Sequence, residues 1–468
     1  MKKQIEINTE IAVIGAGPAG LSAAITAARM EKRVILLEKN GYLGGNAVLG
    51  LPLLGFLDLA GRRIVGGIAQ EYVRRLTERG QCFGHRTCPK HNSVTNIDPE
   101  GFKVLAIEMC REAGVEVLLH LEACGVEKEN GRIRRVLFYG KGNEIAVTAD
   151  LFIDCTGDGD VAYLADCTYE SGQPGTGVLQ PPTVMYTLEQ VDTEKLFDYI
   201  EANPDEMTYS ASIDHRPGYD ADYFRASPNH VFVGLSKIFA RLREEGNCPV
   251  ERNTLIYIKS VHPGEVYVNS TRLLNTDATD IFDLTKAELD GQLQAVALTR
   301  VLKEYVPGFE KAFISSIAPT LGVRETRRFK GTKYLTGEML LEGLIPEDTI
   351  ALGGYKIDIH SGTDRNTVFK TVQEPFGIPY GCLVSAEISN LMIAGRCSSM
   401  DAAALAAVRV MPQCMSMGQA AGMAAAMAVT EKISPAKIDV QKLRERLLEQ
   451  NAVLTMEQVC AIPVNEEG

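Results

Sequence analysis

The chain has 468 residues, which is too many for one hydrophobic core, so we expect two or three domains. Hydrophobic residues make up 45% of it and charged residues 23%, the composition of an ordinary globular protein. The net charge of −12 and the absence of tryptophan argue against a nucleic-acid partner, because such proteins present basic and aromatic surfaces to the nucleic acid.

The eleven cysteines are scattered, odd in number and without any CxxC pair. This pattern indicates reduced thiols and argues against a disulfide framework or a ferredoxin-type cluster. The apolar stretch 11–30 follows two lysines as a signal peptide would, but Gly15, Gly17 and Pro18 would break its helix. The stretch 401–429 contains charged residues and is not a membrane span. We therefore expect a cytoplasmic protein with no membrane partner.

The chain begins with the pattern of a βαβ unit. Residues 9–14 predict a buried strand, residues 18–30 a helix, and residues 33–38 a second buried strand. The elements predicted next are helices at 66–79 and 99–114, a strand at 115–120, and three extended runs separated by turns at 130–131 and 140–143, the last reaching residue 160. This order predicts an α/β fold: a Rossmann-like domain with a parallel sheet and a β-meander.

The middle of the chain departs from this order. Between 165 and 380 strands and helices mix without βαβ regularity, and a long helix is predicted at 284–306. A strand at 390–396 and a small-residue helix at 411–429 then restore the βα pattern. We therefore predict an inserted α+β substrate or cap domain. The expected division is a Rossmann-like domain in two parts at 1–164 and 381–432, the inserted domain at 165–380, and a C-terminal helical segment at 433–468.

A glycine-rich turn, GAGPAG, joins the first strand to the first helix. In this context Gly15 makes the tight turn, Gly17 lets a pyrophosphate approach the backbone, and Gly20 lets the helix pack on the strand. The helix N-terminus, with Pro18 in its first turn, offers free N–H groups to the phosphates. Glu38 ends the next strand, where a carboxylate binds ribose hydroxyls and repels the 2′-phosphate of NADP. The sequence therefore predicts a dinucleotide site.

Three further features favour FAD over NAD, although the two share the ADP half. A second glycine pair, Gly44-Gly45, follows Glu38 closely; the TGD run at 156–158 ends a later strand; and a helix opening near Met411 offers its N–H groups to a flavin ring. No second GxGxxG marks a nicotinamide domain. The Rossmann-like domain is therefore predicted to be FAD-binding. The predicted FAD contacts are Gly15, Gly17, Pro18, Ala19, Gly20, Glu38, Lys39, Gly44, Gly45, Asn46, Ala123, Thr156, Gly157, Asp158, Gly395, Arg396, Met411 and Gly418.

Several longer motifs carry a family resemblance. They are DCTGDGD (154–160), GVRETR (322–327), DIH (358–360), PFGIPY (375–380), AGRC (394–397) and RVMPQCM (409–415). On these the chain resembles the FAD-dependent oxidoreductases of the glutathione reductase-like, two-dinucleotide-binding-fold superfamily, specifically the FAD_oxidored group, from about residue 8 to 430. Its flavin part is also similar to the A subunit of heterodisulfide reductases. That subunit has iron–sulfur cysteines that this chain lacks, so an iron–sulfur cluster is not expected.

Two residues are candidates for catalysis, Arg324 and His360. A flavoenzyme that moves a hydride to or from a carboxylated substrate needs a cation to anchor it and a proton donor or acceptor near the flavin. The alternative is structural: Arg324 and the nearby Arg327 and Arg328 pair with Glu325, Asp358 or a cofactor phosphate, and His360 is a core residue whose hydrogen bonds are satisfied. We predict no metal site, because the loop around His85 offers no fourth ligand.

We expect an oxidoreductase in which FAD exchanges a hydride with a small organic substrate bound between two domains. The size of segment 165–380 motivates this expectation, since a lid excludes water and shapes a pocket. Two alternatives remain open: a flavin electron-transfer subunit, and a non-redox FAD-dependent hydratase or isomerase. A plain NAD dehydrogenase is also conceivable but predicts a colourless protein. A homo-oligomer or a redox partner protein is left open.

Overall fold

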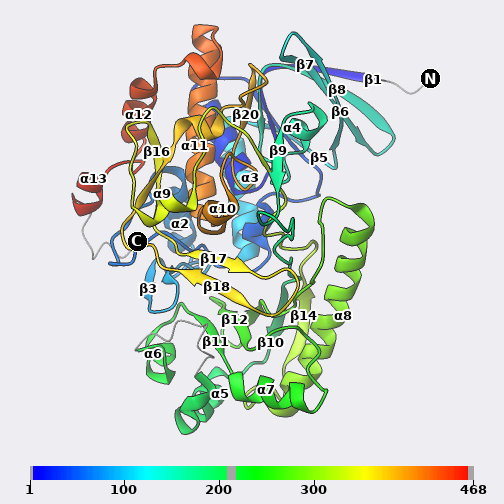
Figure 1. The fold of residues 1–468 in the computed structure, drawn as a ribbon, viewed down its shortest axis with the longest axis vertical. Coiled ribbons are helices and arrows are strands. Elements are labelled where there is room, and N and C mark those ends of the chain that lie inside the picture. Colours follow the sequence, from blue (N-terminus) through cyan, green and yellow to red (C-terminus); the bar gives the residue numbers. More distant parts are fainter. Residues whose placement is uncertain (1–3, 208–217, 462–468) are drawn as a thin grey trace.

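The computed structural model describes residues 4–207 and 218–461, and its first part is built on a seven-stranded sheet. The strand order is β5-β2-β1-β8-β7-β6, and β20 also pairs with β8. The strands are β1 (Gln4–Ile14), β2 (Val34–Glu38), β5 (Glu116–Leu119), β6 (Glu122–Glu129), β7 (Arg132–Gly140), β8 (Asn143–Asp154) and β20 (Leu391–Ile393). Strands β5, β2, β1, β8 and β20 are parallel, whereas β6, β7 and β8 form an antiparallel meander. The predicted Rossmann-like α/β fold is confirmed (Figure 1).

Residues 11–14 of β1 and residues 34–37 of β2 are apolar because both faces of the sheet are covered there. Side chains of β1 alternate between the two faces: Val13 packs in the cluster that contains the helices, and Ala12 and Ile14 pack in a cluster with the meander. The five residues of β2 are buried without exception. This explains why these parts of β1 and β2 read as continuous apolar runs in the sequence.

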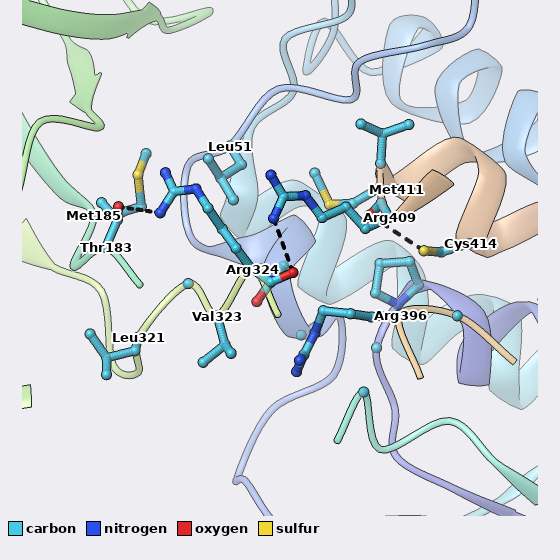
Figure 2. Close-up of a pocket in the computed structure, with 18 of the residues that line it drawn as sticks. Leu51, Thr183, Met185, Leu321, Val323, Arg324, Arg396, Arg409, Met411 and Cys414 are labelled. Carbon is cyan, nitrogen blue, oxygen red and sulfur yellow. Dashed lines mark hydrogen bonds between the residues drawn. The ribbon is translucent and has the colours of Figure 1, made fainter. Parts of the chain in front are cut away.

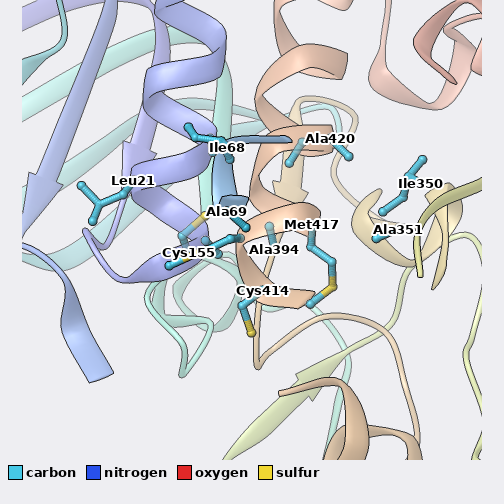
Figure 3. Close-up of a cluster of buried hydrophobic side chains, with 14 of the residues drawn as sticks. Leu21, Ile68, Ala69, Cys155, Ile350, Ala351, Ala394, Cys414, Met417 and Ala420 are labelled. Carbon is cyan, nitrogen blue, oxygen red and sulfur yellow. The ribbon is translucent and has the colours of Figure 1, made fainter. Parts of the chain in front are cut away.

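Helices α1 and α11 pack closely against each other, and small residues allow it. A Cβ atom at Gly418 would lie 2.0 Å from the carbonyl oxygen of Ala19, and one at Gly422 would lie 2.2 Å from that of Ala23. The surrounding cluster, part of which Figure 3 shows, also receives side chains from α2. The helices here are α1 (Pro18–Arg29), α2 (Gly67–Glu78), α3 (Pro99–Ala113), α4 (Asp160–Leu164), α10 (Ala402–Val408), α11 (Met411–Glu431), α12 (Val440–Glu449) and α13 (Met456–Ala461).

A second hydrophobic cluster forms the core of residues 186–317, which we call the cap. Its antiparallel sheet has the order β11-β12-β13-β10-β14. The strands are β10 (Tyr186–Glu189), β11 (Val231–Gly234), β12 (Leu255–Lys259), β13 (Val266–Val268) and β14 (Phe313–Ile317), and the helices are α5 (Thr193–Ala202), α6 (Ala221–Ala226), α7 (Ser236–Glu244) and α8 (Ile281–Tyr305). The cap occupies the lower half of Figure 1.

Residues 327–379 connect the cap to the last part of the sheet. Two strand pairs carry most of this segment, one of which, the β17–β18 hairpin, lies between the cap and the helices of the first part (Figure 1). The elements are β15 (Arg327–Phe329), which pairs with β9 (Tyr169–Ser171), α9 (Gly337–Leu341), β16 (Thr349–Gly353), β17 (Ile357–His360), β18 (Thr367–Lys370) and β19 (Phe376–Pro379). Side chains of β16 and β19 join the helical cluster rather than the cap. The predicted domain limits stay a prediction.

A short hairpin, β3 (Arg86–Cys88) and β4 (Asn92–Val94), lies within the segment expected to be loop. His85 precedes this hairpin, and its ring nitrogens contact Thr95 Oγ1 and Gln70 Oε1 at 2.8 Å each. Among residues 4–207 and 218–461, no helix combines the length and apolar character needed to cross a bilayer.

Two histidines make the stability depend on pH. Burial, with the nearby charge of Arg63, lowers the pKa of His85 to about 3, and burial lowers the pKa of His230 to about 4. An unfolded histidine has a pKa of about 6.5, so on acidification below that value the unfolded chain binds protons that the folded chain does not. The stability that these two histidines contribute is therefore fully present above about pH 6.5, and at about pH 5 each should lower the unfolding free energy by about 2 kcal/mol.

Urea unfolding at neutral pH and near pH 5 measures this loss. His230→Gln should remove the contribution of one histidine to the pH dependence. Equal stability of the unmodified protein at both pH values would contradict the prediction.

Candidate functional site

One continuous cleft of about 480 Å³ runs between the carboxyl ends of the parallel strands, the β17–β18 hairpin and the cap. This volume lies within the range of ligand pockets. The residues predicted to contact FAD line the cleft, with the exception of Gly20, Gly44 and Gly418. Arg324 and His360 line it as well. The structure therefore brings the two sets of predicted site residues to one cavity.

The glycine turn between β1 and α1 has the geometry of a phosphate cradle. Gly15 has a φ of +92°, and a Cβ atom there would lie 2.5 Å from the carbonyl oxygen of Cys155. A Cβ atom at Gly20 would lie 1.7 Å from the carbonyl oxygen of Gly15, so α1 packs directly on the turn. Beside Gly17, by contrast, a Cβ atom would meet nothing within 4 Å. The open space next to Gly17 faces the first N–H groups of α1, which have no partner within the helix.

Glu38 and the second glycine pair surround this turn. The Glu38 carboxylate accepts hydrogen bonds from Ala16 N (2.7 Å) and from the backbone and side-chain nitrogens of Asn40 (2.8 and 2.7 Å). Gly44 N donates to Ala16 O at 2.8 Å, and a Cβ atom at Gly45 would lie 2.9 Å from Gly17 Cα. Glu38 is thus fixed at the end of β2, beside the open space, where a ribose hydroxyl would meet its carboxylate.

The DCTGDGD motif shapes the wall of the cleft after β8. Asp154 is buried and accepts from Thr156 N (3.1 Å), Thr156 Oγ1 (2.8 Å) and Ala162 N (2.9 Å), which fixes the loop and starts α4. Asp158 forms an ion pair with Arg396 at 2.7 Å. Burial and the charge of Asp158 raise the pKa of Asp160 to about 6. Asp158, Asp160 and Arg396 thus line this side of the cleft as a group of interacting charges.

These features fit a bound flavin dinucleotide. The open space at Gly17 accepts a pyrophosphate that approaches the backbone, and Glu38 lies where the adenosine ribose belongs. Met411 begins α11 and lines the same cleft, so the N-terminus of that helix is available to a flavin ring. Gly20 and Gly418 support the fit indirectly, by letting α1 and α11 pack closely behind the cradle.

The three arginines of the GVRETR region have different partners. Arg328 forms a buried ion pair with Glu325 at 2.5 Å, and Arg327 pairs with Asp160 at 3.3 Å. Arg324 instead donates to Pro181 O at 2.6 Å and to Thr183 Oγ1 at 2.7 Å (Figure 2). Burial and the charges of Arg409 and Arg272 lower the pKa of Arg324 to about 9. Arg327 and Arg328 therefore have the structural role that was the alternative, because each forms an ion pair. Arg324 lines the cleft and forms no ion pair with a carboxylate of the described residues.

His360 lies at the end of β17 with both ring nitrogens in contact with other side chains. Its Nδ1 lies 3.1 Å from Thr367 Oγ1 and 3.5 Å from Arg272 Nη1, and its Nε2 lies 3.2 Å from Asp358 Oδ1. Because arginine only donates, Nδ1 is the acceptor and the proton of the neutral ring lies on Nε2. Burial, reinforced by the charges of Arg324 and Arg252, lowers the pKa of His360 to about 3. The imidazole is therefore neutral at physiological pH.

Asp358 is the carboxylate of this group. Burial alone would raise its pKa, but His360, Arg409 and Lys356 together hold the pKa below its ordinary value, so Asp358 is ionised. Its backbone oxygen accepts from Arg409 Nη2 at 3.0 Å. Asp358 Oδ1 lies 3.2 Å from His360 Nε2 but accepts no hydrogen bond from the described residues, so the two side chains, which we call the dyad, are in contact at the edge of the cleft.

Sequence reasoning missed Arg252, Arg272 and Arg409 as members of the site. Arg409 lies in the RVMPQCM motif, in which Met411 was the residue predicted to contact the cofactor, and Figure 2 shows Arg409 beside Arg324. Arg252 and Arg272 lie in segments of the cap without any motif, so no local signal marks them. Their proximity arises only when the cap folds against the β17–β18 hairpin.

Comparison with known proteins supplies a family. The model of the FAD dependent oxidoreductase family matches residues 10–447. A 6-methylpretetramide 4-monooxygenase from Streptomyces rimosus is 29% identical over 166 residues, 32% of this chain and 38% of that protein. A thiamine thiazole synthase from Aeropyrum pernix is 48% identical over 44 residues, 9% of this chain and 16% of that protein. The chain thus matches well under two thirds of either relative.

A solved structure similar to this chain is a geranylgeranyl bacteriochlorophyll reductase-like protein from Thermoplasma acidophilum. The TM-score is 0.47 at 13% identity, and the alignment covers 99% of this chain and 90% of that one.

Proposed function

Since this chain belongs to the FAD dependent oxidoreductase family and its cofactor is FAD, we propose that it transfers a hydride between the flavin and a small organic substrate. The observation that carries the proposal is the continuity of the cleft, which is lined both by the glycine turn and by Arg324, Asp358 and His360. When bound, FAD supplies the donor or acceptor of the two electrons of the hydride. The cap closes the substrate in and excludes water.

The chain's own residues would handle the proton that accompanies the hydride. Oxidation of a C–H bond next to an O–H or N–H releases one hydride and one proton, and reduction consumes one of each. The dyad of Asp358 and His360 holds a proton at Nε2 and a carboxylate beside it, at the edge of the cleft. We assign proton transfer to this dyad and the anchoring of the substrate to Arg324.

The test is an anaerobic titration of the FAD-loaded protein with candidate substrates. Loss of the yellow flavin absorbance upon addition of a substrate, or its return when an oxidised product is added to reduced protein, supports the proposal. Turnover with no change in substrate oxidation state would indicate a hydratase or isomerase instead. Turnover only in the presence of oxygen, with one oxygen atom inserted, would place the chain with monooxygenases such as the Streptomyces rimosus protein.

Two finer assignments rest on the sequence. The motifs at 154–160, 322–327 and 409–415 support a place among the glutathione reductase-like flavoproteins and a relationship to the A subunit of heterodisulfide reductases. The scattered cysteines support a cytoplasmic location and argue against iron–sulfur clusters. A small-molecule substrate is the proposed partner. If this chain formed a stable complex with a redox protein and showed no turnover alone, an electron-transfer subunit would be favoured.

A further inference from the structure

Four guanidinium groups meet on the cap side of the cleft. Arg252, Arg324 and Arg409 line the cleft, and Arg272 lies behind His360. Arg252 and Arg272 are nearly inaccessible, with 4% and 1% of their surface exposed. Within residues 4–207 and 218–461, none of the four has a carboxylate oxygen within 4.0 Å, although buried arginines are normally paired.

Arg252 has two buried nitrogens without hydrogen-bond partners among the described residues, whereas Arg272 has one, its Nε. The two nitrogens of Arg252 are Nε and Nη2. Burial and the charges of Arg324 and Arg272 lower the pKa of Arg252 well below the ordinary value. A buried guanidinium with unpaired N–H groups destabilises the folded protein, and an anionic hydrogen-bond acceptor would offset this cost. Because Arg252 lines the cleft, that acceptor reaches it from the cavity.

The other three arginines are held in place by backbone groups. Arg272 donates to the carbonyl oxygens of Ser361 and Asn366 at 2.7 and 2.9 Å, and Arg409 donates to those of Arg324 and Asp358 at 3.1 and 3.0 Å. Carbonyl oxygens orient a guanidinium without neutralising its charge. The charge of Asp358 acts on all four arginines, while Asp364 and Glu251 act on Arg272 and Glu325 acts on Arg409. Asp358 is thus the carboxylate that acts on Arg252 and Arg324, and His360 is neutral, so positive charge is in excess around these two arginines.

We propose that these arginines form an oxyanion subsite, in which Arg252 and Arg324 bind a carboxylate or phosphate group of the substrate. The inference rests on the proposed function and names the class of substrate: a small organic acid or organic phosphate. Beside the arginines the cleft also has apolar lining residues, among them Leu51, Met185 and Leu321 near Arg324 in Figure 2. The substrate therefore carries its anionic group on an apolar body.

The diphosphate of FAD is another anion that could bind these arginines, but the fold offers it a different site. The glycine turn after β1 supplies the open space and the helix N–H groups, whereas Arg252 comes from the loop before β12 of the cap. If Arg252 held the cofactor instead, its removal would weaken FAD binding rather than the binding of added anions.

The test is a titration of the FAD-loaded protein with benzoate, phenyl phosphate and inorganic phosphate, followed by the flavin absorption spectrum. Benzyl alcohol, which has the same ring without the charge, is the neutral probe. We expect saturable spectral changes with benzoate or phenyl phosphate, and the stronger of the two identifies the oxyanion. Arg252→Gln and Arg324→Gln should each weaken binding by about 10–100-fold, the effect of losing a charge-assisted hydrogen bond.

The matched control is Arg300→Gln, which alters an exposed arginine of α8 and should leave the affinity unchanged. Equal affinities for benzoate and benzyl alcohol would overturn the proposal. So would anion binding that Arg252→Gln leaves intact, or a loss of FAD affinity in that variant with anion binding unchanged. A misfolded Arg252→Gln protein is no obstacle, because the comparison of charged and neutral probes uses the unmodified protein.

The failure of this inference and that of the proposed function are distinguishable. Anion binding that depends on Arg252, with no small molecule able to bleach the flavin, keeps the subsite and overturns hydride transfer. Bleaching by neutral substrates only, without anion binding, keeps hydride transfer and overturns the subsite.

Discussion

Replacing Gly17 with alanine should leave the protein folded and reduce its affinity for FAD by about 10–100-fold. The backbone at Gly17 has a φ of −74°, which alanine adopts without strain, and the new methyl group meets no atom of the protein within 4 Å. The methyl group instead occupies the space in which the pyrophosphate approaches the turn. The hydrogen bonds from the N–H groups of α1 to the phosphates would be lengthened or lost.

Gly20→Ala is the matched comparison, because it adds the same methyl group three residues away. There the Cβ atom would lie 1.7 Å from the carbonyl oxygen of Gly15, which is backbone and unable to move freely. We expect this variant to destabilise the protein without FAD by about 1–3 kcal/mol or more, as overpacking of a core does.

The two variants are separated by measuring stability and binding independently. Urea unfolding of the apoprotein should be unchanged for Gly17→Ala and weakened for Gly20→Ala, and titration of the apoprotein with FAD gives the affinities. Undiminished FAD affinity in Gly17→Ala would contradict the placement of the pyrophosphate at this turn.

The glycine turn was predictable because everything that defines it is local. The positions of Gly15, Gly17 and Gly20 follow from a strand, a turn and a helix that are adjacent in sequence, and the structure places each in the geometry expected. The same holds for the meander, whose turns at 130–131 and 140–143 separate β6, β7 and β8 as predicted. Local backbone chemistry thus predicts the fold of the Rossmann-like part.

The arginine cluster was not predictable, because its members come from distant segments. Arg252 and Arg272 lie in the cap, Arg324 follows it, and Arg409 precedes α11. No spacing in the sequence indicates that they meet. The prediction of Arg324 depended on its neighbours Arg327 and Arg328, yet both of these pair with acidic residues in the structure. The hydrogen-bond partners of each side chain, which only the tertiary structure provides, distinguish Arg324 from them.

The proposed subsite and the dyad depend on each other electrostatically. The charges of Arg324 and Arg252 contribute to the low pKa of His360, a value too low for efficient proton transfer near neutral pH. An anionic group bound between these arginines and the dyad would offset their charge and raise the pKa of His360. Binding of the anionic substrate would thereby bring the dyad closer to the pH at which it must exchange a proton.

Asp358→Asn should reduce turnover by about 10²–10⁴-fold while tightening the binding of anions. Turnover falls because the carboxylate beside Nε2 of His360 is lost, at a contact of 3.2 Å. Anion binding tightens because the amide no longer offsets the charge of Arg409 and its neighbours; a gain of about tenfold corresponds to a Coulomb energy of about 1–2 kcal/mol. The two effects have opposite signs, so simple unfolding does not mimic them.

Stability gives a third readout of the same substitution. Removing the charge of Asp358 leaves the nearby arginines with less compensation, which should lower the unfolding free energy by about 1–2 kcal/mol, the Coulomb energy given above. Added phosphate or benzoate should restore more stability in Asp358→Asn than in the unmodified protein, because an anion that binds only the folded state stabilises it. Asp222→Asn, at an aspartate whose side chain is 95% exposed, is the control and should change none of the three quantities. Weaker anion binding in Asp358→Asn would mean that the carboxylate orients the arginines toward a ligand rather than opposing it, and would contradict the charge balance on which the subsite depends.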